Sequence, residues 1–289
     1  MTATGGAPGQ REEPGPPGWL TALARTVTRD GLGVHPEDWP APADARPAAV
    51  LVLFGPGPRG TEILLLERSA DLRRHAGQPA FPGGGAEPAD DSAIATALRE
   101  AREEVGLDPA GVEVLGPGPE LYLPHSNYLV TPVLAWWRAP SPVFAVDPGE
   151  TAAVARVPIA DLVNPANRVL LSHPRTGAPS PAFRVAGLTA TVWGFTAGIL
   201  DALLRLAGLA QPWGDGPPVE DATVNASIAL TAARLAGAEA GEIDPDDLET
   251  DDRERLDFDV DGQPGAPGGQ DGVAGTAPSA GPSEEGSAA

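Results

Sequence analysis

Strand-like runs alternate with helical segments between residues 47 and 213, and this alternation limits the folds that are open to the chain. Short runs of Val and Leu bounded by Gly and Pro are typical of strands, whereas apolar residues that recur every three or four positions are typical of helices. Their alternation predicts an α/β domain, in which helices cover a sheet. The predicted strands are 48–54, 62–67, 112–115, 129–137 and 152–158, and the predicted helices are 94–105 and 189–206.

The segments on either side of this domain, 47–213, have a different composition. Residues 1–18 form a Gly- and Pro-rich arm that we expect to be disordered, because it has too little apolar surface to offset the entropy of ordering. Residues 19–46 indicate a short helix and a Pro-rich joint. Residues 214–289 form an acidic, Gly/Pro-rich tail that we expect to be largely disordered, with a helix at 223–235 left open. A tail that binds a basic partner is the alternative.

Composition excludes several classes of site and partner. The chain has no cysteine, so disulfides, thiolate metal sites and a cysteine nucleophile are excluded. The formal net charge of −21 argues against a nucleic-acid partner, because such binding depends on Lys and Arg that neutralise phosphates. The sequence shows no apolar run of about 18 residues and no secretory signal, so we expect no membrane partner and a cytoplasmic location. The sequence does not decide whether the protein forms a homodimer.

Three glutamates share one face of the helix predicted at 94–105. Glu100, Glu103 and Glu104 lie three and four residues apart, so their carboxylates repel one another. They also lie in the C-terminal half of the helix, where the macrodipole favours cations. A hard divalent cation such as Mg²⁺ or Mn²⁺ accepts oxygen ligands and can bridge to substrate phosphates, so the cluster indicates a metal site. The alternative is a solvated face in which Arg99 and Glu103 form an ordinary ion pair.

The segment around this cluster resembles the Nudix box of the Nudix hydrolases. The matching positions are Gly85, an acid six residues later at Asp91, Arg99-Glu100, Glu103-Glu104 and the closing Gly106-Leu107. Asp91 stands where the family usually has Glu, which we expect to weaken a contact that braces Arg99, and Ala101 is small for an aliphatic position. The resemblance implies an α/β/α sandwich with a mixed sheet, in which the box forms a loop-helix-loop catalytic motif.

The same resemblance implies the chemistry, which is attack of water on a phosphorus of a nucleoside diphosphate linked to another group. At the matching positions, it implies that Glu100, Glu103, Glu104 and the backbone carbonyl of Gly84 are metal ligands, and that Arg99 orients the carboxylates. Glu100 is one candidate for the general base. A residue on a loop outside the box is the other.

The residues before the box are similar to a signature of the coenzyme A diphosphatase branch of this family. The recurring residues are Leu64-Leu65, Arg68-Ser69, Arg73, Gly77 and Phe81-Pro82-Gly83-Gly84, with Leu66 where Thr is usual. The similarity implies that coenzyme A, or a thioester or disulfide of it, is split into 3′,5′-ADP and a 4′-phosphopantetheine product. Arg68, Arg73 and Arg74 would then bind phosphate oxygens, and Gly83, Gly84 and Gly85 would bring backbone close to phosphate and metal.

Several alternatives remain at this point. The arginines can be a basic stripe that keeps the loop soluble, and the substrate can be another nucleoside diphosphate derivative, such as ADP-ribose or a dinucleoside polyphosphate. A catalytically silent module that binds a nucleotide or a protein is the alternative from a different class. Phe81 is interpreted as a plug beneath the loop, His75 as a hydrogen-bonded structural residue, and Trp136, Trp137 and Trp193 as core or interface side chains.

Overall fold

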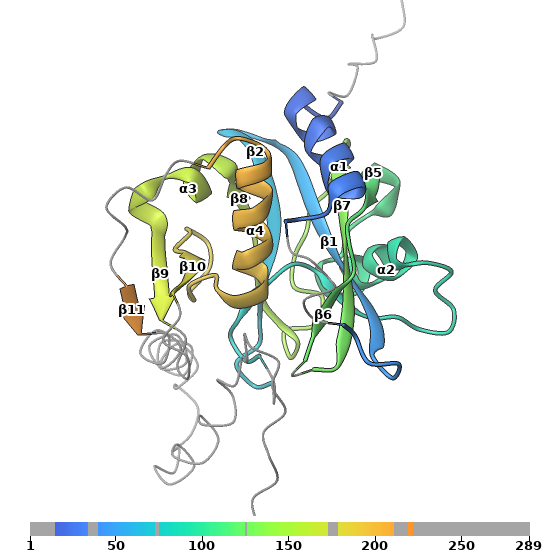
Figure 1. Ribbon diagram of the computed structural model, residues 1–289. Helices are drawn as coiled ribbons and strands as arrows, with labels where there is room; N and C mark the ends of the chain where they lie inside the picture. The colour runs from blue at the N-terminus through green and yellow to red at the C-terminus, as the bar shows by residue number, and fades with distance from the viewer. Residues whose placement is uncertain are drawn as a thin grey trace, which may run out of the picture.

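A mixed eight-stranded sheet forms the centre of the molecule (Figure 1). The computed structural model describes residues 15–33, 40–72, 75–124, 126–172, 179–210 and 219–221. The main path of the sheet runs β3-β2-β1-β7-β5, with β4 paired to β1, β6 to β7 and β8 to β2. Its strands are β1 (Arg46–Gly57), β2 (Gly60–Arg68), β3 (Pro79–Ala80), β4 (Gly83–Gly85), β5 (Val112–Pro117), β6 (Leu121–Leu123), β7 (Tyr128–Trp137) and β8 (Thr151–Pro158).

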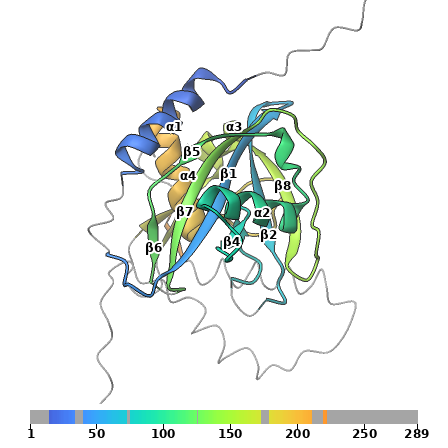
Figure 2. The same ribbon diagram turned by 90° about the vertical axis from the view of Figure 1, so that its right-hand side faces the viewer.

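Helices cover both faces of this sheet, and Figure 2 views the sheet from the side of α2. The helices are α1 (Gly18–Asp30), α2 (Ala93–Val105), α3 (Ile159–Val163) and α4 (Gly194–Leu206). Alternate residues of β1 point to opposite faces, because successive side chains of a strand alternate. Val52 and Phe54 pack in one core with α1 and α4, whereas Leu51 and Leu53 pack in a second core with α2. The predicted α/β/α sandwich with a mixed sheet is therefore confirmed.

Strand β1 connects the parts of the molecule that form the site. It pairs antiparallel with β2 through the hairpin predicted from the Gly55–Gly60 turn, and parallel with β7. Its first half also pairs antiparallel with the short strand β4, in the register Ala48 to Gly85 and Val50 to Gly83. Residues Gly83–Gly85, whose glycines suggest a loop, therefore form the short strand β4. This pairing fixes the glycines against the sheet, directly before α2.

The C-terminal part of the domain differs most from the prediction. Helix α4 begins at Gly194 and not at 189, because the preceding loop is bound to Glu67 of β2. The buried carboxylate of Glu67 accepts hydrogen bonds from the backbone N–H of Thr189, at 2.6 Å, and from its hydroxyl. A second sheet, β10-β9-β11, was not predicted; it consists of β9 (Arg168–Ser172), β10 (Pro179–Phe183) and β11 (Val219–Asp221).

The remaining predictions concern the ends of the chain and the membrane. The helix expected from residue 19 is present as α1, whereas the arm up to residue 14, the helix proposed at 223–235 and the rest of the acidic tail lie outside the described residues. Within the ranges that the structure describes, no helix combines the length and the apolar character needed to cross a membrane.

Candidate active site

Helix α2 is capped at both ends, which fixes the orientation of its glutamates. Ser92 is the N-cap, and its hydroxyl accepts a hydrogen bond from the backbone N–H of Ala95 at 3.2 Å. Gly106 ends the helix in the left-handed conformation, at φ 67°, which suits a residue without a Cβ. Ala97 and Ala101 are fully buried against the sheet. The small Ala101 thus lets the helix approach β1 closely, and Glu100, Glu103 and Glu104 lie beside this contact face.

Arg99 is braced by Asp90 and not by Asp91, which corrects the sequence-based expectation. Arg99 Nε lies 3.1 Å from Asp90 Oδ1, and Arg99 Nη2 lies 3.0 Å from Asp90 Oδ2. The side chain of Asp90 is only 6% exposed and also accepts hydrogen bonds from the backbone N–H of Glu87 and the hydroxyl of Thr96. Asp91 is exposed and makes no side-chain hydrogen bond to any of the described residues.

The electrostatics of the Asp90–Arg99 pair follow from these contacts. Hydrogen bonds from Arg99 and from the Glu87 amide favour the ionised carboxylate and lower the pKa of Asp90 to about 2. The hydrogen bond to Asp90, together with the carboxylates of Glu100 and Glu103, raises the pKa of Arg99 above its ordinary value. Arg99 Nη2 also donates to the backbone carbonyl of Gly85 at 2.9 Å. The pair therefore joins α2 to the end of β4, with both groups charged.

The third nitrogen of Arg99 faces two glutamates of the same helix. Arg99 Nη1 lies 3.0 Å from a carboxylate oxygen of Glu100 and 3.0 Å from one of Glu103. Glu103 is half-exposed, with 51% of its side-chain surface accessible. Glu100 is more enclosed, and burial raises its pKa although the adjacent Arg99 opposes that effect. The i,i+4 ion pair of Arg99 and Glu103, which belonged to the alternative of a solvated face, is thus present, but as part of a larger network.

Glu104 is the most enclosed of the three glutamates, at 9% exposure. Its Oε2 accepts a hydrogen bond from the backbone N–H of Gly83 at 2.9 Å, and its Oε1 lies 3.7 Å from Arg68 Nη1. Burial nevertheless raises the pKa of Glu104 to about 7, because these partners only partly replace the lost hydration, and the charges of Glu100 and Glu150 add to the rise. A positive ligand at this place would favour the ionised form.

The glycines of β4 are required for different reasons. A Cβ on Gly83 would lie 2.4 Å from the carbonyl oxygen of Ala49, whereas a Cβ on Gly84 would lie 2.5 Å from a carboxylate oxygen of Glu100. At Gly85 the nearest atom would be in the ring of Tyr128, at 3.5 Å. Gly83 therefore allows β4 to pair with β1, and Gly84 allows a glutamate of α2 to approach the backbone of β4.

The donor set of this region fits a hard divalent cation. Three carboxylates and the carbonyl groups of β4 are oxygen donors, which Mg²⁺ and Mn²⁺ prefer. Glu100 lies close to the backbone of Gly84, and burial disfavours the negative charge of Glu104. A cation bound here would offset that unfavourable charge. Among the described residues no three acidic or histidine side chains converge on one point, since Arg99 holds Glu100 and Glu103 while Gly83 holds Glu104.

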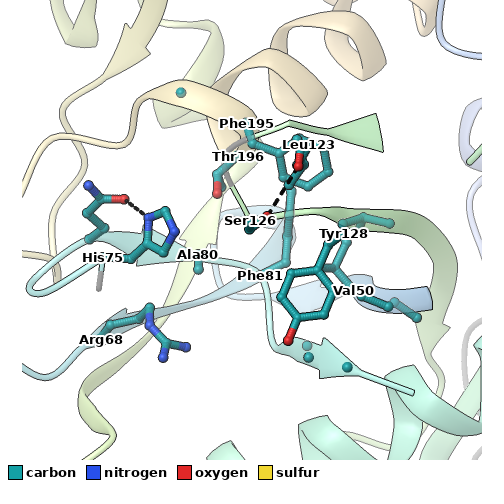
Figure 3. Close-up of a pocket in the computed structure, with 18 of the residues that line it drawn as sticks. Val50, Arg68, His75, Ala80, Phe81, Leu123, Ser126, Tyr128, Phe195 and Thr196 are labelled. Atoms are coloured by element: carbon teal, nitrogen blue, oxygen red, sulfur yellow. Dashed lines mark hydrogen bonds between the residues drawn. The ribbon is translucent and has the colours of Figure 1, made fainter. Parts of the chain in front are cut away.

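A cavity of about 610 Å³ opens beside the glycines of β4 (Figure 3). It lies mainly on the α4 side of the sheet and is lined by Gly83, Gly84 and Gly85, by Arg68, and by residues of β1 and β7. His75, labelled in Figure 3, also lines it, and its Nδ1 lies 3.1 Å from Gln78 Oε1. Arg68 and the three glycines, all of them predicted substrate-binding residues, thus line one cavity, whereas Arg73 and Arg74 lie outside the described residues.

Sequence reasoning missed two walls of this cavity. One is formed by Arg46 and Tyr128, which occupy matching positions on the parallel strands β1 and β7. The other is formed by residues 193–196 at the start of α4, which include Trp193.

The remaining aromatic residues lie as the sequence indicated. Trp136 and Trp137 are buried core residues. Phe81 is also buried, which agrees with its predicted role as a plug. Asn127, in the turn before β7, has φ 52°, a left-handed conformation that asparagine adopts more readily than most residues.

Comparisons with known proteins point to one family. Residues 44–175 match the model of the NUDIX domain. A protein of Photorhabdus laumondii subsp. laumondii, described as an uncharacterized Nudix hydrolase, NudL, is 37% identical over 186 residues, which are 64% of this chain and 98% of that protein. NudL of Escherichia coli strain K12 is 39% identical over 57% of this chain and 84% of its own. A solved structure, a Nudix hydrolase from M. smegmatis, RenU, is 26% identical over 39% of this chain and 70% of its own, with a TM-score of 0.33.

Proposed function

The chain belongs to the Nudix hydrolase family, and on that premise we propose that it cleaves the diphosphate of coenzyme A, or of its thioesters and disulfides, to 3′,5′-ADP and a 4′-phosphopantetheine product. It is a hydrolase of nucleoside diphosphate derivatives; the specific substrate is the proposal. One structural observation supports it above others. Arg68, part of the signature before the box, lines the cavity, and its Nη1 lies 3.7 Å from the Glu104 carboxylate.

The residues that would hold the ion are Glu100, Glu103, Glu104 and the backbone carbonyl of Gly84, with Mg²⁺ or Mn²⁺ as the ion. When bound, such an ion neutralises charge on the diphosphate and makes an adjacent water more acidic. Arg99 keeps Glu100 and Glu103 oriented toward this region, and Asp90 fixes Arg99 in turn. Glu100 and Glu103 are thus positioned by Arg99 and Asp90, two residues outside the proposed substrate-binding groups.

Substrate binding is assigned to groups at the edge of the cavity. The guanidinium of Arg68 would donate to phosphate oxygens as a planar, permanently charged group. Its Nε is buried and has no hydrogen-bond partner among the described residues, so the protein leaves one donor of this group unused. Gly83, Gly84 and Gly85 present backbone without side chains, which lets the diphosphate approach α2. Arg73 and Arg74 are proposed as further phosphate ligands from the sequence alone.

Two carboxylates are candidates to accept the proton of the attacking water. Glu100 lies in the box, and burial makes it more basic than an exposed glutamate. Glu150 lies on a loop outside the box, and its backbone carbonyl accepts a hydrogen bond from Ser69 N–H at 2.9 Å, beside Arg68. A Glu150→Gln variant should lower kcat without changing Mg²⁺ affinity if Glu150 is the base, whereas Glu100→Gln should lower both.

A substrate panel tests the proposal directly. The purified protein is incubated with Mg²⁺ and coenzyme A, acetyl coenzyme A, ADP-ribose or a dinucleoside polyphosphate, and the products are weighed by mass spectrometry. We expect 3′,5′-ADP from the first two compounds and little turnover of the others. Consumption of ADP-ribose while coenzyme A survives would refute the proposed substrate but not the hydrolase chemistry. No turnover of any diphosphate would refute both.

A further inference from the structure

Aromatic side chains gather on one half of the cavity. The chain has only two tyrosines, and both of them, Tyr122 and Tyr128, line it. Phe81 and Phe195 line it as well, and Figure 3 shows them on the same side as Tyr128, opposite Arg68 and His75. The cavity therefore has an aromatic half, defined here by Tyr122, Tyr128, Phe81 and Phe195, and a polar half that includes Arg68 and His75.

Arg46 and Tyr128 form a flat surface in this aromatic half. The guanidinium carbon of Arg46 lies 4.1 Å from the centre of the Tyr128 ring, which is the geometry of a cation–π contact. Arg46 Nη2 also donates to the backbone carbonyl of Ser126 at 2.8 Å, so the guanidinium is held in place. Both residues begin strands that are paired in parallel, Arg46 opposite Tyr128. The sheet thus fixes the position of the pair relative to the glycines of β4.

Two hydroxyl groups on the aromatic side of the cavity, those of Tyr122 and Ser126, already have partners within the protein. The hydroxyl of Tyr122 donates to Asn127 Oδ1 at 3.1 Å, and the hydroxyl of Ser126 donates to the carbonyl of Leu123 at 3.5 Å. What this half offers to a ligand is consequently flat, weakly polar surface. Such a surface suits a planar aromatic ring, whereas an extended chain with amide groups would lose hydrogen bonds to water there without replacement.

We infer that the aromatic half binds the nucleobase of the substrate, stacked on the Arg46–Tyr128 pair, while the diphosphate lies at the glycines of β4. This inference rests on the proposed function only in that the substrate carries a nucleobase. One substrate can reach both places, because the Tyr128 ring lies directly beside Gly85, and Gly85 follows Gly84, whose carbonyl is a proposed metal ligand. The polar half then receives the groups on the far side of the diphosphate from the base.

Ligand pairs that differ only in the base test this assignment. Adenosine 5′-monophosphate and ribose 5-phosphate are titrated into the full chain by calorimetry, without metal and without turnover. We expect wild type to prefer the nucleotide by about 10-fold or more, since stacking of a base on an aromatic side chain has that effect. Tyr128→Ala and Arg46→Ala should each weaken binding of the nucleotide and leave binding of ribose 5-phosphate unchanged, whereas Tyr128→Phe should bind as wild type does.

Controls separate this effect from loss of structure. Phe144 is an exposed aromatic residue, at 59%, that does not line the cavity, so Phe144→Ala should change neither affinity. Arg46 is itself exposed, so Arg46→Ala keeps the test valid if Tyr128→Ala unfolds. If Tyr128→Ala and Arg46→Ala lose equal affinity for both ligands, or lose affinity for neither, the inference is overturned. Hydrolysis of coenzyme A without a preference for the nucleotide refutes this inference alone, and a preference without hydrolysis of coenzyme A refutes the proposed substrate alone.

Discussion

Asp90 binds the guanidinium of Arg99 through both of its carboxylate oxygens, with Nε to Oδ1 at 3.1 Å and Nη2 to Oδ2 at 3.0 Å. Two parallel contacts fix the plane of a guanidinium as well as its position. Arg99 then presents its remaining nitrogen, Nη1, to Glu100 and Glu103 at 3.0 Å each. A residue that touches no candidate metal ligand therefore controls the orientation of two of them.

We predict that Asp90→Asn lowers kcat or Mg²⁺ affinity by about 10- to 100-fold, as is usual when the partner of a ligand-orienting group is lost. Asp91→Asn is the matched control, because Asp91 is adjacent in sequence but exposed and not bound to Arg99. Steady-state kinetics and metal titrations of both variants give the answer. Equal losses in the two variants would contradict the assignment of the brace to Asp90.

Replacement of a proposed metal ligand should remove catalysis and not the fold. Glu103→Gln and Glu104→Gln are each expected to lower kcat by on the order of 10² or more, because an amide is a weaker ligand than a carboxylate for a hard cation. Thermal unfolding should show that both variants still fold. A wild-type rate in either variant would contradict the role proposed for that glutamate.

The two glutamates should differ in their effect on pH dependence. Folding raises the pKa of Glu104 from 4.5 to about 7, so the metal-free folded protein binds a proton more tightly than the unfolded chain does. The free energy of unfolding should therefore fall between pH 4.5 and about 7, by on the order of 3 kcal/mol at about 1.4 kcal/mol per tenfold change in proton affinity. Saturating Mg²⁺ should remove most of this decrease, and the apparent Mg²⁺ affinity should rise with pH over the same range.

Denaturant titrations of the metal-free protein at several pH values measure this slope. Glu104→Gln should remove most of it, since the amide does not titrate, and the smaller remaining part comes from Glu100, whose pKa burial also raises. Glu103→Gln is the control and should retain it, because Glu103 is half-exposed. A slope that is undiminished in Glu104→Gln would show that another group is responsible.

Two adjacent glycines should respond differently to the same added methyl group. In Gly84→Ala the new Cβ meets the end of the flexible Glu100 side chain, so we expect a stable protein with Mg²⁺ affinity reduced by about 10-fold or more. In Gly83→Ala the Cβ meets the backbone of β1, so we expect a loss of stability of about 1–3 kcal/mol. Denaturant titration and metal calorimetry on both variants measure the two effects. A large loss of stability in Gly84→Ala, or a stable Gly83→Ala with weakened Mg²⁺ binding, would contradict the prediction.

Local patterns of the sequence determined the elements of the fold and the composition of the glutamate cluster. Strands β1, β2, β5, β7 and β8 and helix α2 were predicted within a few residues, because alternation of side chains, helical spacing and capping depend on neighbours along the chain. The same holds for Glu100, Glu103 and Glu104, whose common helix follows from their spacing. The resemblance to a known family added the sandwich and the reaction class.

Tertiary structure alone decided which residues surround that cluster. The choice of Asp90 over Asp91 depends on the path of the loop between β4 and α2, which the spacing of the box does not specify. The contact of Arg46 with Tyr128 joins residues more than 80 positions apart and follows from the register of β1 with β7. The start of α4 depends on Glu67 of β2. Such contacts are set by packing between distant segments, and a reading of neighbours along the chain carries no information about them.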